Sequence, residues 1–209
     1  RRPYRIGMSV SGQVRERGVA AERGPRARMQ RHMLSTAIRL MQDGFIEVFG
    51  GPSGAPGEAQ RAGMAVASTS TLLGALSALM LETRPHGYLA VMAYLDRVAD
   101  ADVAQVRPVL AALARRPVTF GWGPRFLHST SLYHKDGPPL GAFLQITGAV
   151  ATDLAVPGRP YTFGQLQAAQ AAGDRQALTR RGRPVLRLHL TDRASGIVQL
   201  LDAVRSLGN

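Results

Sequence analysis

The sequence contains no cysteine, and only one of its 26 basic side chains is a lysine. Without cysteine the chain has no disulfide bond, no thiolate nucleophile and no Cys-ligated zinc site. Aromatic residues make up only 6% of the chain and are not spaced through its basic stretches, so a platform that stacks nucleic-acid bases is not expected. No long apolar stretch is free of polar residues, and neither a signal peptide nor a membrane span is recognisable. We therefore expect a cytoplasmic protein with no membrane association.

The net charge of +12 is concentrated near the N-terminus, where the first 31 residues hold nine arginines against Glu16 and Glu22. Such an arm can bind phosphates without sequence preference, but the rest of the chain interleaves basic and acidic residues. A nucleic-acid-binding role is therefore the less favoured interpretation. We predict a basic arm without regular structure at residues 1–26, followed by one α/β domain at residues 27–209.

Apolar periodicity alternates between helical and strand spacing along the chain. It predicts helices at residues 27–43, 58–82, 100–116, 163–181 and 195–207. It predicts short strands at residues 45–49, 88–95, 118–120, 141–147 and 184–190. Pro108 is expected to kink the third helix, and Gly173 to break the fourth. Short apolar strands separated by helices are typical of an α/β protein, here a three-layer α/β/α sandwich with a mainly parallel sheet.

The densest group of reactive side chains lies between Gly123 and Pro138, and it includes the lone lysine. In chain order its candidate residues are Arg125, His128, Ser129, Thr130, His134 and Lys135. Histidine transfers protons near neutral pH, hydroxyls donate hydrogen bonds, and cations stabilise a phosphate or a developing oxyanion. The segment follows a predicted strand, and ligands of parallel sheets bind beyond the carboxyl ends of strands. We therefore predict a loop that binds a small phosphorylated or polyhydroxylated substrate; a plain surface lysine is the alternative interpretation.

Three other patterns carry weaker functional signals. Gly50–Gly57 is a glycine-rich segment between a strand and a helix, but it lacks the Gly-Lys-Ser/Thr ending of a P-loop and is interpreted first as a connection. Ser68–Thr71 could donate hydroxyls to a phosphate, although hydroxyls within a helix more often bond to the helix itself. The five histidines show no metal-ligand spacing, so no metal site is predicted.

A family resemblance rests on several long matches. These are Gly121-Trp-Gly-Pro-Arg-Phe-Leu-His-Ser-Thr130, His134-Lys135, Gly141-Ala-Phe-Leu-Gln-Ile-Thr147, Val156-Pro-Gly-Arg-Pro-Tyr-Thr-Phe-Gly164, Ala168-Ala-Gln-Ala-Ala-Gly-Asp174 and Gly182-Arg-Pro-Val-Leu-Arg-Leu-His-Leu-Thr-Asp192. Over roughly residues 79–208, the chain resembles the C-terminal sugar-isomerase lobe of glucose-6-phosphate isomerases, in particular those of actinobacteria and those fused to transaldolase.

The resemblance implies an α/β/α sandwich and an aldose–ketose isomerase that interconverts glucose 6-phosphate and fructose 6-phosphate without a metal or organic cofactor. By motif position, His128 would open the sugar ring and Lys135 would stabilise the developing charge, with His134 as a further catalytic residue. The substrate pocket would be lined by Arg125, Ser129 and Thr130. The implied partners are a sugar phosphate and either a second copy in a homodimer or a separate N-terminal isomerase lobe.

The reactive segment departs from the family pattern at three positions. Ser131 and Asp136 stand where the family has glycine, and Leu132 stands where it has glutamine. A positive φ at either glycine position would strain the backbone, and Asp136 could neutralise Lys135. The glutamate that the family uses as its base has no recognisable counterpart. The alternative hypothesis is therefore a non-catalytic sugar-phosphate-binding or regulatory module of the same fold.

Overall fold

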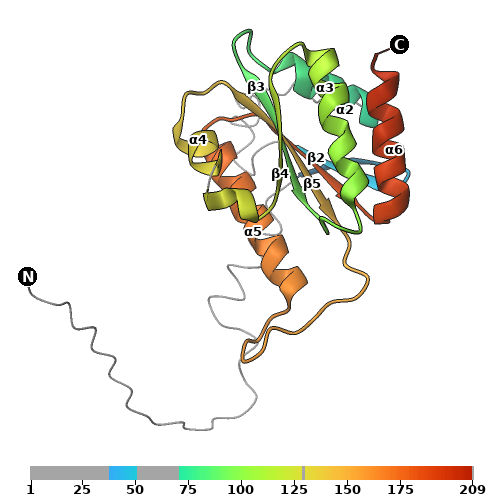
Figure 1. The fold of residues 1–209 in the computed structure, drawn as a ribbon, viewed down its shortest axis with the longest axis vertical. Helices are drawn as coiled ribbons and strands as arrows, with labels where there is room; N and C mark the ends of the chain where they lie inside the picture. The colour runs from blue at the N-terminus through green and yellow to red at the C-terminus, as the bar shows by residue number, and fades with distance from the viewer. Residues whose placement is uncertain (1–37, 51–70, 129, 209) are drawn as a thin grey trace, which may run out of the picture.

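The computed structural model describes residues 38–50, 71–128 and 130–208 (Figure 1). Both the arm predicted at residues 1–26 and the greater part of the glycine-rich segment Gly50–Gly57 lie outside these ranges, as do Ser68, Thr69 and Ser70. Within the described ranges, a single mixed sheet with helices on both sides forms the body of the molecule.

The sheet has six strands in the order β1-β2-β6-β5-β3-β4. Their bounds are β1 Ile38–Asp43, β2 Ile46–Gly50, β3 Tyr88–Tyr94, β4 Val118–Trp122, β5 Gly141–Gly148 and β6 Val185–Leu190. Strands β6, β5, β3 and β4 are mutually parallel, whereas the β1–β2 hairpin adds to β6 in antiparallel fashion. The predicted α/β class with a mainly parallel sheet is therefore confirmed.

The helices alternate with the strands of the parallel part. Their bounds are α2 Leu72–Leu81, the 3₁₀ helix η2 Ala101–Gln105, α3 Val106–Ala114, the 3₁₀ helix η3 Arg125–His128, α4 Thr130–Asp136, α5 Phe163–Arg180 and α6 Arg193–Ser206. Side-chain caps fix three of the starts, because Thr71, Thr162 and Asp192 each accept a hydrogen bond from a backbone N–H of the first turn. At α5 the cap is reciprocal, since Gln165 also accepts from the N–H of Thr162. None of the described helices is long and apolar enough to cross a membrane.

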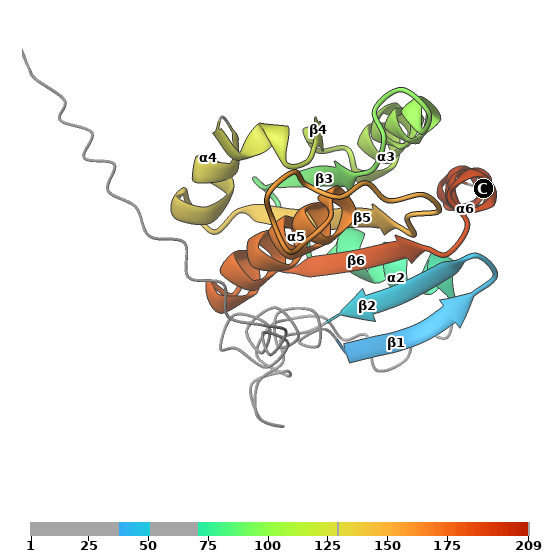
Figure 2. The same ribbon diagram turned by 90° about the horizontal axis from the view of Figure 1, so that it is seen from below.

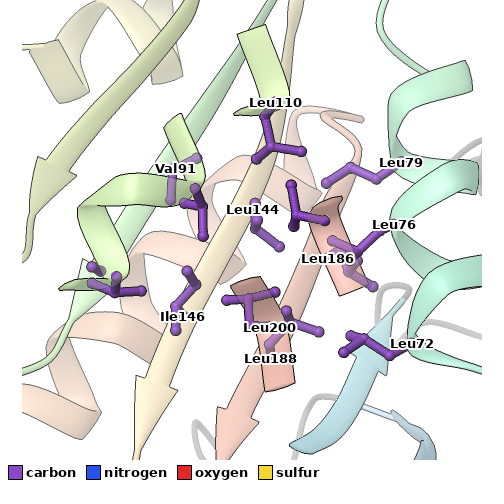
Figure 3. Close-up of a cluster of buried hydrophobic side chains, with 14 of the residues drawn as sticks. Leu72, Leu76, Leu79, Val91, Leu110, Leu144, Ile146, Leu186, Leu188 and Leu200 are labelled. Atoms are coloured by element: carbon purple, nitrogen blue, oxygen red, sulfur yellow. The ribbon is translucent and has the colours of Figure 1, made fainter. Parts of the chain in front are cut away.

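Helices α2, α3 and α6 cover one face of the sheet, and α4 and α5 cover the other (Figures 1 and 2). The first face is packed with aliphatic side chains from the strands and from these three helices, of which Figure 3 labels ten. Leu144, Ile146, Leu186 and Leu188 are fully buried there. At about 25 cal/mol for each square ångström of apolar surface removed from water, this cluster is the main source of stability.

Four predictions about local structure were wrong or need correction. Residues 38–43 form a strand rather than a helix, because Gly44 adopts a positive φ of 52° in a two-residue hairpin turn instead of capping a helix. Pro108 does not kink α3, since it lies in the first turn, where its missing N–H has no partner to lose. Helix α5 continues unbroken through Gly173. Lastly, residues 125–128 and 130–136 form η3 and α4 rather than a loop.

Candidate functional site

The direction in which successive parallel strands are added to the sheet reverses between β3 and β5. Strand β3 is followed by α3 and then by its neighbour β4, whereas β5 lies on the other side of β3 and is followed by α5 on the opposite face. The chain therefore leaves the carboxyl ends of β3 and β5 toward opposite faces. Open α/β sheets bind their ligands in the crevice that this divergence creates.

A pocket of about 70 Å³ lies at this point, beneath the N-terminal half of α5. Its floor comes from the carboxyl ends of three parallel strands, through Tyr94 of β3, Thr147 and Gly148 of β5, and Arg187 and His189 of β6. Its roof is the face of α5 that carries Gly164, Gln167, Ala168, Ala171 and Ala172. The pocket is thus built by segments that are far apart in the sequence.

Three polar side chains on the floor are bonded to one another. The Nε of Arg187 donates to Oγ1 of Thr147 at 3.2 Å, and Nδ1 of His189 lies 3.0 Å from the same hydroxyl oxygen. The guanidinium carbon of Arg187 also lies 4.6 Å from the centroid of the Phe49 ring on β2. These contacts fix the orientation of Arg187 on the floor.

Burial and neighbouring charge shift the pKa values of both basic groups on the floor. Burial, reinforced by the positive charge of Arg175 on α5, lowers the pKa of Arg187 to about 10, against a smaller opposing effect of Glu47. The guanidinium is therefore still a cation at neutral pH. Burial also lowers the pKa of His189, with a further contribution from Arg187, while Glu47 acts in the opposite direction. The pocket floor is thus a positively charged, partly desolvated surface.

The loop that precedes α5 is tied to the start of the helix by one carboxylate. Asp153 accepts hydrogen bonds from the hydroxyl of Thr162 and from the N–H of Gly164, both at the start of α5. A Cβ atom on Gly164 would lie 2.6 Å from a carboxylate oxygen of Asp153, so a larger residue here would displace this carboxylate. The first N–H groups of α5 are consequently occupied within the protein, and the roof of the pocket is firmly placed.

The predicted site residues are distributed over two edges of the sheet. Arg125 begins η3 and is exposed, and Thr130 begins α4 and is exposed. The backbone of His128 ends η3, but its side chain and the whole of Ser129 are outside the described part of the structure. Phe126 of η3 packs edge-to-face on Tyr94, at the carboxyl end of β3. The chain then runs as α4 toward the amino ends of the strands, which is opposite to the edge that we predicted for the histidine and lysine.

His134 is placed in the core of the protein rather than at a ligand site. Its side chain is buried, Nδ1 lies 2.9 Å from the hydroxyl of Tyr88, and its ring stacks on Tyr88 and meets Phe143 edge-on. Burial, with a smaller effect of Lys135, lowers the pKa of His134, so the imidazole is neutral at pH 7. Burial also raises the pKa of Tyr88 to about 12.

Lys135 is paired, but with a different carboxylate from the predicted one. Its Nζ lies 2.6 Å from Oδ1 of the buried Asp174 on α5, and the hydroxyl of Tyr94 donates to Oδ2 of the same residue. Asp136 instead pairs with Arg181 at 2.8 Å on the surface, so the expectation that it neutralises Lys135 is wrong. Lys135 is thereby connected through Asp174 to Tyr94, a residue of the pocket floor.

The two glycine-to-side-chain departures cause no backbone strain. Ser131 and Asp136 lie within α4, and among the described non-glycine residues only Arg115 has a positive φ. Arg183 secures the end of this helix, because its Nη2 donates to the backbone carbonyls of Lys135 and Gly137. The remaining weak candidate, Thr71, uses its hydroxyl to cap α2.

The sequence interpretation missed the polar floor of the pocket. Val185 to Leu190 reads as a buried strand, yet Arg187 and His189 occupy alternate positions in it, and Thr147 occupies the matching face of β5. That period-two placement of polar residues in a central strand was the available signal. In the described ranges, no three metal-ligating side chains are grouped in a way that could hold a metal ion.

Comparison with known proteins identifies a similar fold. No family model and no curated protein matches the chain. Among solved structures, it is similar to the hypothetical protein TT0462 from Thermus thermophilus, with a TM-score of 0.55 and 19% sequence identity. The match covers 66% of this chain and 39% of the Thermus chain, so this chain spans well under half the length of that protein. At this identity the likeness concerns the fold alone.

Proposed function

We propose that this chain is the ligand-binding lobe of a sugar-phosphate isomerase of the glucose 6-phosphate to fructose 6-phosphate class. The observation that carries the proposal is the cationic pocket at the divergence point of β3 and β5. An anionic ligand of modest size suits such a pocket, because it compensates the partly buried charge of Arg187. The resemblance over residues 79–208 supports the same class, since this range contains β3, β5, β6 and α5, which build the pocket.

An aldose–ketose isomerase needs a base that moves a proton between C1 and C2 of the open sugar. Glu47 is our candidate for this role. It lies opposite His189 in the β2–β6 pairing, and its side chain is on the α5 side of the sheet because Ile46 and Val48 face the opposite core. Its charge acts on both Arg187 and His189. In this proposal His128 opens the ring, and Arg125, Ser129 and Thr130 bind the substrate.

Lys135 has the weakest structural support as a participant, since Asp174 compensates its charge. This ion pair favours the second candidate function, a sugar-phosphate-binding or regulatory module that does not catalyse isomerisation. In that case Lys135 positions α4 against α5, and the pocket binds the ligand without turning it over. A second lobe or a second copy of the chain would complete the site in either case, and a cytoplasmic location suits both.

An assay of fructose 6-phosphate formation from glucose 6-phosphate tests the first proposal, with the change in Tm on adding 6-phosphogluconate as a parallel measurement. Turnover that disappears in Glu47→Gln while the ligand-induced Tm shift remains supports the isomerase with Glu47 as base. A Tm shift without turnover in the unmodified chain selects the binding module. If neither turnover nor a Tm shift is observed, both proposals are wrong.

A further inference from the structure

The face of the sheet beneath α5 carries charge where a central strand normally carries aliphatic side chains. Strand β6 is flanked on both sides, by β5 and β2, and its residues Leu186, Leu188 and Leu190 are fully buried on the opposite face. On the α5 side the same strand presents Arg187 and His189. A charged strand face that is withdrawn from water even in part reduces stability unless something compensates it.

The contacts of Arg187 leave its terminal nitrogens available to the pocket. Its Nε is bonded to Thr147, and Phe49 supports one face of the guanidinium. Within the described ranges, no acceptor is bonded to Nη1 or Nη2 of Arg187. Two parallel N–H donors at fixed positions are the geometry that binds the oxygens of a phosphate or a carboxylate in bidentate fashion.

The charges around Arg187 also favour the binding of an anion. Arg175 on α5 is close enough to repel Arg187, and His189 would add a second positive charge on the floor when protonated. Glu47 on β2 is the acid whose charge acts on both groups. An anion bound between the floor and α5 would convert this repulsion into attraction.

Helix α5 cannot supply the anion site through its N-terminus. The N–H of Gly164 is bonded to Asp153, and those of Gln165 and Leu166 are bonded to Thr162. Any anion in the pocket must therefore be bound by side chains of the floor. The volume of about 70 Å³ suits a tetrahedral oxyanion, whereas a whole hexose phosphate is too large and its sugar would extend out of the pocket.

We propose that Arg187, Thr147 and His189 form the subsite for the phosphate group of a phosphate monoester. Arg187 binds two phosphate oxygens through Nη1 and Nη2, His189 donates through Nε2, and the hydroxyl of Thr147 holds both basic groups in place. The assignment of the ligand as a sugar phosphate rests on the proposed function, whereas the oxyanion subsite rests on the geometry of the floor. The subsite lies apart from Lys135, which Asp174 already compensates.

Titration calorimetry with inorganic phosphate and sulfate tests the subsite directly. We expect Arg187→Met to weaken phosphate binding at least tenfold, and Arg187→Lys to weaken it less, because lysine keeps the charge but loses the paired donors. The matched control is Arg205→Met, an exposed arginine of α6 paired with Asp202, which should leave the affinity unchanged. Arg187→Met should also keep the Tm of the free protein or raise it, since it removes a partly buried cation that Arg175 repels. An unchanged or higher Tm would show that the site is lost while the fold is retained.

The pH dependence of sulfate binding tests the role of His189, because sulfate does not titrate between pH 5 and pH 8. Affinity should rise as pH falls through the pKa of His189, which lies below its ordinary value in the free protein. His189→Gln should remove this dependence, while Glu47 and Arg187, the charged groups that act on His189, stay in place. A flat profile in the unmodified protein would remove His189 from the subsite.

The outcomes for the subsite and for the proposed function are separable. If Arg187→Met retains full phosphate affinity, or if Lys135→Met abolishes it, the subsite is wrongly assigned even when fructose 6-phosphate binds. If Arg187→Met abolishes phosphate binding but fructose 6-phosphate binds no more tightly than phosphate, the subsite stands and the sugar-phosphate function fails. Unphosphorylated fructose serves as the control that should not bind.

Discussion

The two faces of the sheet differ in what holds them together. The face beneath α2, α3 and α6 is a continuous aliphatic core, whereas the face beneath α5 has a small apolar cluster at one end and polar side chains at the other. Neighbouring residues of β5 illustrate the difference, since Leu144 is part of the aliphatic core and Gln145 donates from Nε2 to the carbonyl of Ala171 on α5.

This division predicts that stability depends mainly on the aliphatic face, whereas the proposed subsite lies on the opposite side of the same strands. A side chain on the aliphatic face loses packing when it is shortened, and nothing polar replaces the lost contacts. The α5 face instead joins polar groups in pairs, and it carries the proposed oxyanion subsite. Substitutions on the two faces should therefore have different consequences, and their comparison tests the division.

The largest effect is expected from deleting aliphatic volume. Leu144→Ala should lower the free energy of unfolding by about 3 kcal/mol, because a fully buried leucine in a dense core leaves a cavity. Gln145→Met, one residue away on the other face, should change it by less than about 1 kcal/mol. Urea denaturation measures both, with the exposed Leu132→Ala as control. Equal losses at residues 144 and 145 would contradict the division.

The next largest effect concerns the ion pair between Lys135 and Asp174. Asp174→Asn should lower the free energy of unfolding by about 2 kcal/mol, since it leaves the partly buried Lys135 without its counter-charge while Tyr94 can still donate to the amide oxygen. A double-mutant cycle with Lys135→Met should give a coupling of about 1 to 2 kcal/mol. A coupling near zero would show that α5 is held by its apolar contacts alone.

The pH dependence of stability should reflect the two histidines of the α5 face, the buried His134 and the partly buried His189. The folded-state pKa values of His134 and His189 are both lowered, so in acid the unfolded chain binds protons that the folded chain does not. Stability should therefore decrease as pH falls below about 6.5, by at most about 1.4 kcal/mol for each histidine and pH unit. His134→Asn, which keeps an acceptor for Tyr88, should reduce this slope. An unchanged slope in that variant would place the titration elsewhere.

The smallest effect is expected at the end of α3, away from both faces. Arg115 is exposed and adopts a φ of 48°, a left-handed conformation that favours glycine. Arg115→Gly should raise the free energy of unfolding by about 0.5 kcal/mol, after the greater freedom of glycine in the unfolded chain is deducted. Arg115→Ala, which keeps the strained conformation, should leave it nearly unchanged. Differential scanning calorimetry resolves the two.

The parallel part of the fold was predictable because each strand is a short apolar run bounded by turn residues, as in Tyr88–Tyr94 and Gly141–Gly148. Strand β1 was missed because the apolar spacing of residues 38–43 is compatible with a helix, and only pairing with β2 decides between the two. Helix α4 was missed because Gly123 and Pro138 made the intervening segment look like a loop.

From the sequence we could select a segment rich in reactive groups, but not the partners that these groups have in the fold. The segment around Lys135 was selected for its density of reactive groups, but in the fold His134 bonds to Tyr88 and Lys135 pairs with Asp174. Both partners come from elements distant in the sequence, so local sequence could not reveal them. Arg187 and His189 could have been found from their alternation in β6, because charge at alternate positions of a central strand needs an explanation.

Helix α5 is held against the sheet partly by polar contacts, and this affects how easily the helix separates from the sheet. Few large apolar side chains hold this helix, Leu178 being its one buried leucine, and Asp174 and Arg175 are buried beside it. Lifting α5 away would expose only the smaller apolar cluster and not the aliphatic core, so its amide hydrogens should exchange with solvent faster than those of β3 and β5, which need global unfolding. Since α5 is the roof of the pocket, a ligand bound beneath it would slow that exchange, so the rate of hydrogen exchange in this one helix reports whether the pocket is filled.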